Sequence, residues 1–339
     1  MNLIFFLSIP IVIILVNYIF NKKNVLQSLT GDNHQLFVEK KNIPLTGGIF
    51  LTILSIIIFY SQIEYFYFFI IFLIGILSDF KVLRSAKIRF YLQVISIFFL
   101  VFNFNLHLSD LRIIPLNYLL EYKIFSYIFF SFCLLIVVNG TNFIDGLNGL
   151  VIGYYMIVLM FIFNLEFIDK YDDAKEIILI YLILLIFLFI FNFLNKLYLG
   201  DSGSYLIGFA IGALLITIYK EFSIFSPFYV VLLLWYPCFE NLFSIIRKYR
   251  FNLSPLKADN KHLHHLLFYY LNKRFNFSKL SSNNIASLLI NFVNLNFFVL
   301  GSNYIYSSII QIILITSLIA IYIISYLILF NFRFKKSNY

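Results

Sequence analysis

The sequence predicts an all-α protein that crosses a membrane about eleven times, built as one domain over residues 1–339. Of the 339 residues, 62% are hydrophobic and only 12% are charged, and the mean hydropathy is +0.92. The apolar residues also gather in runs close to the length of about 20 residues that a helix needs to cross a bilayer. An ordinary soluble domain is therefore excluded.

Eleven apolar runs follow one another along the chain, separated by polar islands. We expect helices at 3–20, 46–63, 65–79, 88–105, 124–140, 149–165, 177–192, 203–219, 226–246, 282–301 and 305–330. The first run lacks a positive leading segment and a small-residue cleavage site, and Lys22 and Lys23 follow it, so we expect an uncleaved span. Cys133 and Cys238 lie in apolar runs without CxxC spacing, which indicates neither a disulfide framework nor a zinc site.

Lysine and arginine are unevenly divided between alternate loops. One set carries 20 of the 25 basic residues and comprises 21–43, 80–89, 141–148, 192–204, 247–281 and the end of the chain. Because cytoplasmic loops carry the excess of Lys and Arg, we expect this set in the cytoplasm, with the N-terminus outside and the C-terminus inside. The net charge of +9 then reflects membrane topology, and no nucleic acid is implied.

The island NGTNFIDGLNGL, from Asn139 to Leu150, places polar side chains and glycines directly beside an apolar run. A charge in the bilayer core costs about 2.5 kcal/mol or more, so an acid kept at its boundary needs a metal, a proton or a ligand as partner. Asp145 is therefore a candidate functional residue. The alternative is a capped turn in which Asp145 and Asn148 bond backbone amides.

A second island, LYLGDSGSYLIGF from Leu197 to Phe209, sets Asp201 among glycines and serines. Mg2+ binds one or two carboxylates and takes its other ligands from substrate phosphates and water. Asp201 fits that role. The alternative is that Asp201 or Ser202 caps the helix that follows, which metal binding does not exclude.

Three of the five histidines lie in SPLKADNKHLHHLL, at His262, His264 and His265. A zinc site is disfavoured because no matching ligand occurs elsewhere and adjacent residues on a helix, His264 and His265, are expected to point apart. With Lys257 and Lys261, the imidazoles at a helix start offer many donors to phosphate and sugar groups. The lysines by themselves are equally well explained by contact with anionic lipid headgroups.

Three further groups lie at expected cytoplasmic helix ends or within a span. Asp79 in GILSDF and Arg89 after it are candidates for orienting a substrate or accepting a proton and for holding a phosphate, or else they pair with nearby charges. Glu240 lies inside the run 226–246, and we expect Arg247 or Lys248 as its partner.

In chain order, PLTGG, GILSDF, NGTNFIDGLNGL, LYLGDSGS, the proline-acid span with RK, and SPLKADNKHLHH resemble the polyprenyl-phosphate N-acetylhexosamine-1-phosphate transferases of glycosyltransferase family 4. This family includes initiators of O-antigen and teichoic acid synthesis and the phospho-N-acetylmuramoyl-pentapeptide translocase. The HLHH form resembles the branch that uses UDP-N-acetylglucosamine. The resemblance covers nearly the whole chain.

The resemblance implies a glycosyl-1-phosphate transferase in the bacterial inner (plasma) membrane, with its active site facing the cytoplasm. A sugar-1-phosphate would pass from a UDP-sugar to undecaprenyl phosphate, giving undecaprenyl-diphospho-sugar and UMP for cell-envelope polysaccharide synthesis. It implies Mg2+ as cofactor, with Mn2+ as a substitute, and leaves a homodimer open. The implied residues are Asp201 and Asn142 for metal; Asp79, Asp145, His262, His264 and His265 for catalysis; and Asn148, Tyr198, Arg89, Lys41 and Asn139 for substrate.

The chain departs from the family pattern at acidic positions. Paired aspartates are usual where this chain has Ser78 and Asp79, and an aspartate is common at the position of Glu240. A phosphate monoester has a second pKa of about 6, so a general base is dispensable near neutral pH. Ser78→Asp is accordingly expected to leave turnover intact or to raise it.

Two other functions compete with the enzyme. A transporter of lipid-linked sugars predicts polar residues near the bilayer midplane and broken helices in both halves, whereas the acids and histidines here gather at one face. A catalytically inactive relative that acts as an assembly partner is motivated by Ser78, and Asp145, Asp201 and the HLHH cluster argue against it.

Overall fold

The computed structural model describes residues 3–27, 42–59, 64–170, 174–252, 254 and 259–334. Within these ranges the regular structure is helical, with one isolated bridge between Gln27 and Pro44. The helices are α1 (Leu3–Lys23), α2 (Gly47–Phe59), α3 (Glu64–Asp79), α4 (Ala86–Asn103), α5 (Ile114–Leu120), α6 (Lys123–Ile144), α7 (Leu150–Phe163), the short 3-10 helix η1 (Ile168–Lys170), α8 (Ala174–Phe193), α9 (Gly200–Glu221), α10 (Pro227–Arg250), α11 (Leu263–Phe275), α12 (Lys279–Ser302) and α13 (Ser308–Phe334).

The all-α prediction is confirmed for the part of the chain that the structure describes, and each of the eleven apolar runs coincides with a helix. Within the described residues, seven helices are long and apolar enough to cross a membrane, namely α4, α6, α8, α9, α10, α12 and α13. Shorter apolar helices lie at Gly47–Ile56, Phe66–Asp79 and Leu150–Phe163. Helices α5 and α11 fall in predicted loops. The number of spans and the orientation of the two termini stay predictions.

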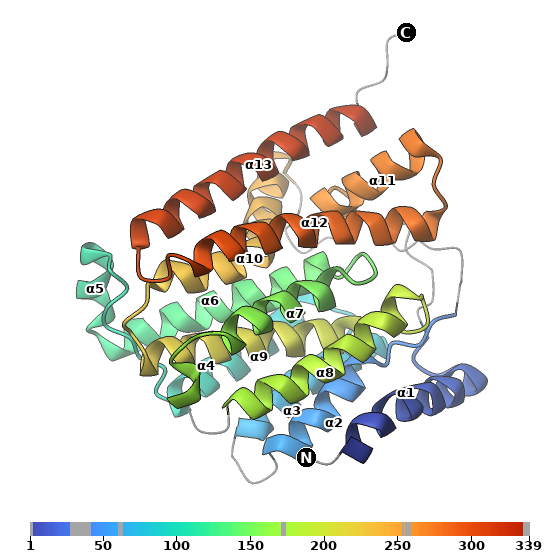
Figure 1. Cartoon of the computed structure of the whole chain (residues 1–339), viewed down its shortest axis with the longest axis horizontal. Coiled ribbons are helices and arrows are strands. Elements are labelled where there is room, and N and C mark those ends of the chain that lie inside the picture. The colour runs from blue at the N-terminus through green and yellow to red at the C-terminus, as the bar shows by residue number, and fades with distance from the viewer. Residues whose placement is uncertain are drawn as a thin grey trace.

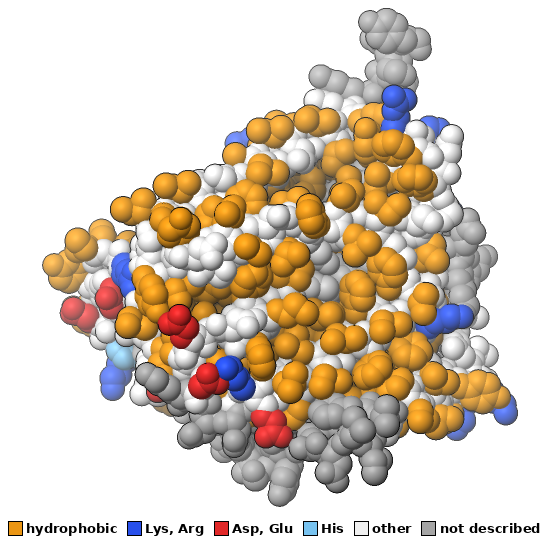
Figure 2. Space-filling model, in the orientation of Figure 1, with side chains coloured by type: hydrophobic (Ala, Val, Ile, Leu, Met, Phe, Trp, Pro, Cys, Tyr) orange, Lys and Arg blue, Asp and Glu red, His pale blue; other side chains and the backbone are white. Residues whose placement is uncertain are grey.

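The surface is suited to lipid. Figure 2 shows hydrophobic side chains spread over the middle of one face, while Asp and Glu gather toward the left end, where α5 lies in Figure 1. Large apolar side chains such as Ile309 and Ile124 are more than two-thirds exposed. Apolar patches of this extent are uncommon on soluble monomers, so the chain is a multi-pass membrane protein.

Helix α9 lies at the centre of the bundle and is the most buried of the seven long apolar helices, whereas α4 and α13 are the least buried. It packs against α2, α3 and α6, and α6 packs in turn against α10 (Figure 1). Glycines permit these close crossings. A β-carbon at Gly75 of α3 would collide with the backbone of Ser202 on α9, and one at Gly140 of α6 would collide with the carbonyl of Pro237 on α10. The ends of α3, α6 and α9 are thereby brought together.

Helix α10 contains a proline in its interior, Pro237. Proline has no N–H, so the carbonyl four residues earlier loses its helical donor. That carbonyl, on Leu233, instead accepts a hydrogen bond of 2.8 Å from the hydroxyl of Tyr154 on α7. The interrupted turn is therefore satisfied from a neighbouring helix, directly before the buried Glu240.

Candidate active site

The start of α9 is capped by another helix. Gly200 adopts a φ of +76°, the left-handed conformation that glycine accepts without strain. The two carboxylate oxygens of Asp79, the last residue of α3, accept hydrogen bonds from the backbone N–H groups of Asp201 (2.8 Å) and Ser202 (3.0 Å). The alternative that Asp201 or Ser202 caps this helix is therefore wrong, because Asp79 supplies the cap and leaves the Asp201 carboxylate for other contacts.

The carboxylate of Asp201 accepts hydrogen bonds from side chains of three other helices. Its Oδ2 accepts hydrogen bonds from the Arg89 guanidinium of α4 and the Ser78 hydroxyl of α3, each at 2.5 Å, and Arg89 also contacts that hydroxyl. Its Oδ1 accepts a hydrogen bond of 2.8 Å from the Asn142 amide of α6. The predicted pair Asp201 and Asn142 is thus brought together, with Arg89 beside it.

Asp145 follows the last residue of α6 and is partly buried. Burial, followed by the negative charges of Asp201 and Asp79, raises the pKa of its carboxyl well above the usual value. No described residue hydrogen-bonds to this carboxylate. The acid therefore lies near two others, with no cationic partner among the residues that the structure describes.

The turn after Asp145 is held by asparagines from elsewhere in the chain. Asn192 accepts the backbone N–H of Gly149 at 2.5 Å, and Asn283 accepts that of Asn148 at 2.7 Å. The Asn148 side chain is buried and donates weakly to Asn195, at 3.4 Å. The capped-turn alternative for Asp145 and Asn148 is not what the structure shows, since these acceptors come from α8, the segment after it and α12.

The donor set suits a hard cation. In the described part of the chain, no group of three or more His, Cys, Asp and Glu side chains lies where it could hold a metal. Mg2+ needs fewer protein ligands, because substrate phosphates and water complete its octahedron. Asp145, with a raised pKa and no hydrogen-bond donor from the described residues, and the neighbouring Asp201 fit such an ion, because its charge would relieve the repulsion between them.

Two histidines lie against the loop that carries Asp145. The rings of His264 and His265 on α11 are 4.1 Å apart between centroids and almost completely buried. A β-carbon at Gly146 would lie 2.7 Å and 2.6 Å from their Nε2 atoms. The expectation that these neighbours point apart is wrong, because Gly146 has no side chain and both rings reach the same loop. Burial lowers the pKa of His264 to about 3, and neither of its ring nitrogens has a partner among the described residues.

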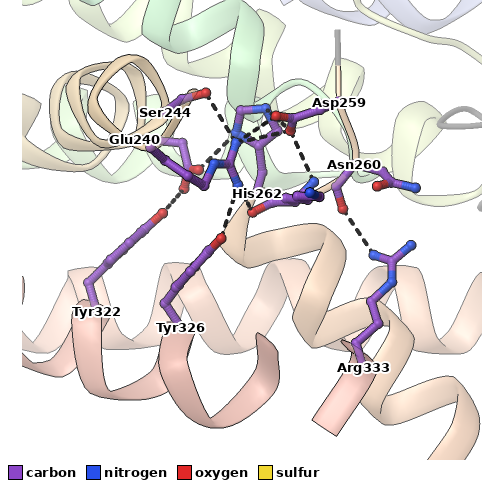
Figure 3. Close-up of polar contacts among 10 residues, drawn as sticks. Glu240, Ser244, Asp259, Asn260, His262, Tyr322, Tyr326 and Arg333 are labelled. Carbon is purple, nitrogen blue, oxygen red and sulfur yellow. Dashed lines mark hydrogen bonds and ion pairs between the residues drawn. The ribbon is translucent and has the colours of Figure 1, made fainter. Parts of the chain in front are cut away.

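Glu240 is paired differently from the expectation. Its partners are His262, whose Nδ1 lies 2.8 Å from Oε1, and Tyr322, whose hydroxyl donates to Oε2 at 2.7 Å (Figure 3). Arg247 instead binds Asp259 through both carboxylate oxygens, at 2.9 and 3.0 Å. The predicted partners Arg247 and Lys248 were wrong because α11 and α13, far along the chain, pack against α10.

The other residues predicted to bind substrate are Asn139, Tyr198 and Lys41. Asn139 lies one turn deeper on α6 than Asn142 and donates to Gln93 of α4 at 3.1 Å. Tyr198 is partly buried just before α9, and its backbone pairs with the segment before α2 through Pro44 and Gly47. Lys41 lies outside the described residues.

Sequence reasoning missed several residues of this region. The asparagines of α12, such as Asn283 and Asn291, hold the loop after Asp145, and their occurrence within an apolar run was a usable signal. Tyr322 and Tyr326 of α13 contact the Glu240 and Arg247 side chains, but 25 tyrosines are spread along the chain and nothing distinguishes these two.

The chain is similar in sequence to known proteins over the segment that carries these residues. The sequence model of glycosyl transferase family 4 matches residues 62–219, which include Asp79, Arg89, Asn142, Asp145 and Asp201. A Bacillus subtilis protein named probable undecaprenyl-phosphate N-acetylglucosaminyl 1-phosphate transferase is 30% identical over 202 residues, 59% of this chain and 56% of the relative. An undecaprenyl-phosphate alpha-N-acetylglucosaminyl 1-phosphate transferase of Escherichia coli O157:H7 is 29% identical over 57% of this chain and 54% of its own length.

A phospho-N-acetylmuramoyl-pentapeptide-transferase of Prochlorococcus marinus is 28% identical over 66% of this chain and 69% of its own length. The match spans about half the length of the first two relatives. The matched segment contains the acids that meet at the ends of α3, α6 and α9. Over residues 62–219 the chain is similar to glycosyl transferase family 4, and these relatives are named as transferases of sugar-1-phosphates to polyprenyl phosphates or as the phospho-N-acetylmuramoyl-pentapeptide-transferase.

Proposed function

We propose that the protein transfers a sugar-1-phosphate, from an N-acetylhexosamine linked to UDP, to undecaprenyl phosphate. The products are undecaprenyl-diphospho-sugar and UMP, and the reaction initiates synthesis of a cell-envelope polysaccharide such as O-antigen. The protein lies in the bacterial inner (plasma) membrane, and its active site faces the cytoplasm. The observation that carries the proposal is the meeting of Asp201, Arg89, Asn142 and Asp145 at one end of the bundle.

In this reaction a phosphate oxygen of the lipid attacks the β-phosphorus of the UDP-sugar. The new bond joins that oxygen to phosphorus, and the bond to the bridging oxygen of UMP breaks. The attacking phosphate is already ionised near neutral pH, since its second pKa is about 6. The chain therefore needs to position two anionic substrates and neutralise charge, and it needs no protein nucleophile.

Each group of the site has a part in this positioning. Asp145 and Asp201, with Asn142, would hold Mg2+, which when bound neutralises charge on the diphosphate. Arg89 lies beside Asp201 and supplies a fixed positive charge. Asp79 fixes the start of α9 and so the direction of the Asp201 side chain. His264 and His265 lie at Gly146, next to Asp145, where an imidazole N–H can meet a phosphate oxygen.

The arrangement favours an enzyme over a transporter. Asp79 ends α3, Asp145 follows α6, and Asp201 lies in the first turn of α9. These acids therefore lie at helix ends and not in the middle of broken spans, as a transporter site predicts.

The test is UMP release by the purified protein in detergent, with UDP-N-acetylglucosamine, undecaprenyl phosphate and Mg2+. Reactions without lipid or with EDTA serve as controls, and other UDP-sugars are tried if the first is inert. Asp201→Asn is expected to abolish release. Asp169→Asn is the matched control, because Asp169 lies beyond the far end of α7 in an exposed ion pair with Lys175. Release that needs neither lipid nor metal, or that survives Asp201→Asn, contradicts the proposal.

A further inference from the structure

A buried polar network joins α10, the start of α11 and α13. Glu240 is 1% exposed and lies within the apolar helix α10, where an acid must be paired. Its two oxygens are held by different elements, His262 at the N-cap of α11 and Tyr322 on α13. Figure 3 shows both tyrosines of α13 pointing up toward this group.

Arg247, two turns after Glu240 on α10, holds the other half of the network. Its guanidinium donates to both oxygens of Asp259, to the hydroxyls of Ser244 (3.2 Å) and Tyr326 (3.1 Å), and to the carbonyl of Lys261. The segment that leads into α11 is therefore fixed to α10 and α13 together.

His262 lies between the two carboxylates. Its Nδ1 faces Glu240 at 2.8 Å, and its Nε2 faces Asp259 at 3.5 Å. A carboxylate only accepts hydrogen bonds, so both ring nitrogens are directed at protein acceptors. The imidazole is 5% exposed. Of the three clustered histidines, His262 is thus held by the protein on both sides, while His264 and His265 face Gly146.

The position of His262 determines where the other two histidines lie. His262 is the N-cap of α11, and His264 and His265 follow in the first turn. Because a helix is rigid over one turn, a shift of its N-cap moves both rings relative to Gly146. Tyr322 and Tyr326 are one turn apart, and their stacked rings are 2% and 5% exposed. Their hydroxyls therefore reach this geometry from the last helix of the chain.

We propose that Tyr322 and Tyr326 are positioning residues of the transferase, acting through Glu240 and Arg247 to hold His262, and with it His264 and His265, against the loop of Asp145. The proposal rests on the proposed function for its activity readout only. A buried network can also serve stability alone, so the experiment must separate the two roles.

Tyr322→Phe and Tyr326→Phe each remove one hydroxyl and keep the ring among Phe239 and Phe243. Tyr236→Phe is the matched control, because Tyr236 is 1% exposed in the same aromatic group and its hydroxyl has no partner among the described residues. We would measure kcat, KM for the UDP-sugar, the thermal unfolding midpoint, and deuterium uptake of residues 259–268.

We expect Tyr322→Phe to lower kcat about tenfold, with KM changed less than about twofold, an unfolding midpoint close to that of Tyr236→Phe, and faster deuterium uptake at 259–268. A tenfold loss corresponds to about 1.4 kcal/mol of transition-state stabilisation. Wild-type kcat in both α13 variants, or a loss that follows the unfolding midpoint alone, overturns the proposal. If the wild-type protein releases no UMP from any UDP-sugar, the proposed function fails, and unchanged deuterium uptake in the variants then overturns the positioning role independently.

Discussion

Gly146→Ala tests whether the placement of His264 and His265 against the loop of Asp145 matters for turnover. The new β-carbon would lie 2.6 Å from Nε2 of His265 and 2.7 Å from Nε2 of His264, whereas ordinary contact begins at 3.4 Å. The two rings must therefore retreat by about 0.7–0.8 Å, or the loop must move by as much. Both rings are almost fully buried, so a retreat meets packed neighbours.

A displacement of about 1 Å in a catalytic group costs roughly 100-fold in rate. We therefore expect kcat for UMP release to fall between about tenfold and 100-fold in Gly146→Ala. Overpacking of this kind destabilises by about 1–3 kcal/mol, so activity is normalised to folded protein by size-exclusion chromatography and by the unfolding midpoint.

Gly212→Ala is the matched control. It makes the same substitution within α9, where the β-carbon would lie 2.9 Å from a methyl group of Leu134, a side-chain tip that can yield. We expect near wild-type kcat in this variant. Equal kcat in Gly146→Ala and Gly212→Ala would show that the histidines at Gly146 do not take part in turnover.

Three further predictions concern charge. Asp145→Asn removes a carboxyl whose pKa is raised by burial and by the negative charges of Asp201 and Asp79. The thermal unfolding midpoint at pH 7 is therefore expected to rise, while UMP release falls about 100-fold or more. A lower midpoint would contradict the repulsion between Asp145 and these two carboxylates. Burial lowers the pKa of His264 to about 3 from 6.5, so below pH 6.5 this imidazole binds a proton in the unfolded chain but not in the folded chain. The free energy of unfolding therefore decreases as the pH decreases, by at most about 1.4 kcal/mol per pH unit. Denaturation measured between pH 7 and 5 should show a shallower dependence of this free energy on pH in His264→Gln. Ser78→Asp adds a carboxylate where Arg89 already contacts both Ser78 and Asp201. Turnover is expected to persist or rise, and the Mg2+ concentration for half-maximal turnover is expected to fall. Loss of turnover would show that this position does not tolerate the acid.

The sequence alone determined the positions of the eleven apolar helices, though not of α5 and α11, and it singled out most of the acids that the structure brings together. Apolar runs at the length of a membrane span are a local property, since each helix satisfies its own backbone hydrogen bonds, and every run coincides with a helix. Acids beside glycines at the ends of those runs are costly in lipid, so Asp79, Asp145 and Asp201 could be singled out without a structure.

Tertiary structure alone decided which groups meet. Asp79 caps α9 across 122 residues of sequence separation, and Glu240 pairs with His262 and Tyr322 instead of the nearby Arg247. The two histidines converge because Gly146 leaves space for both. Such partnerships depend on how helices distant in sequence pack against one another, and residue type and local spacing contain no record of that packing.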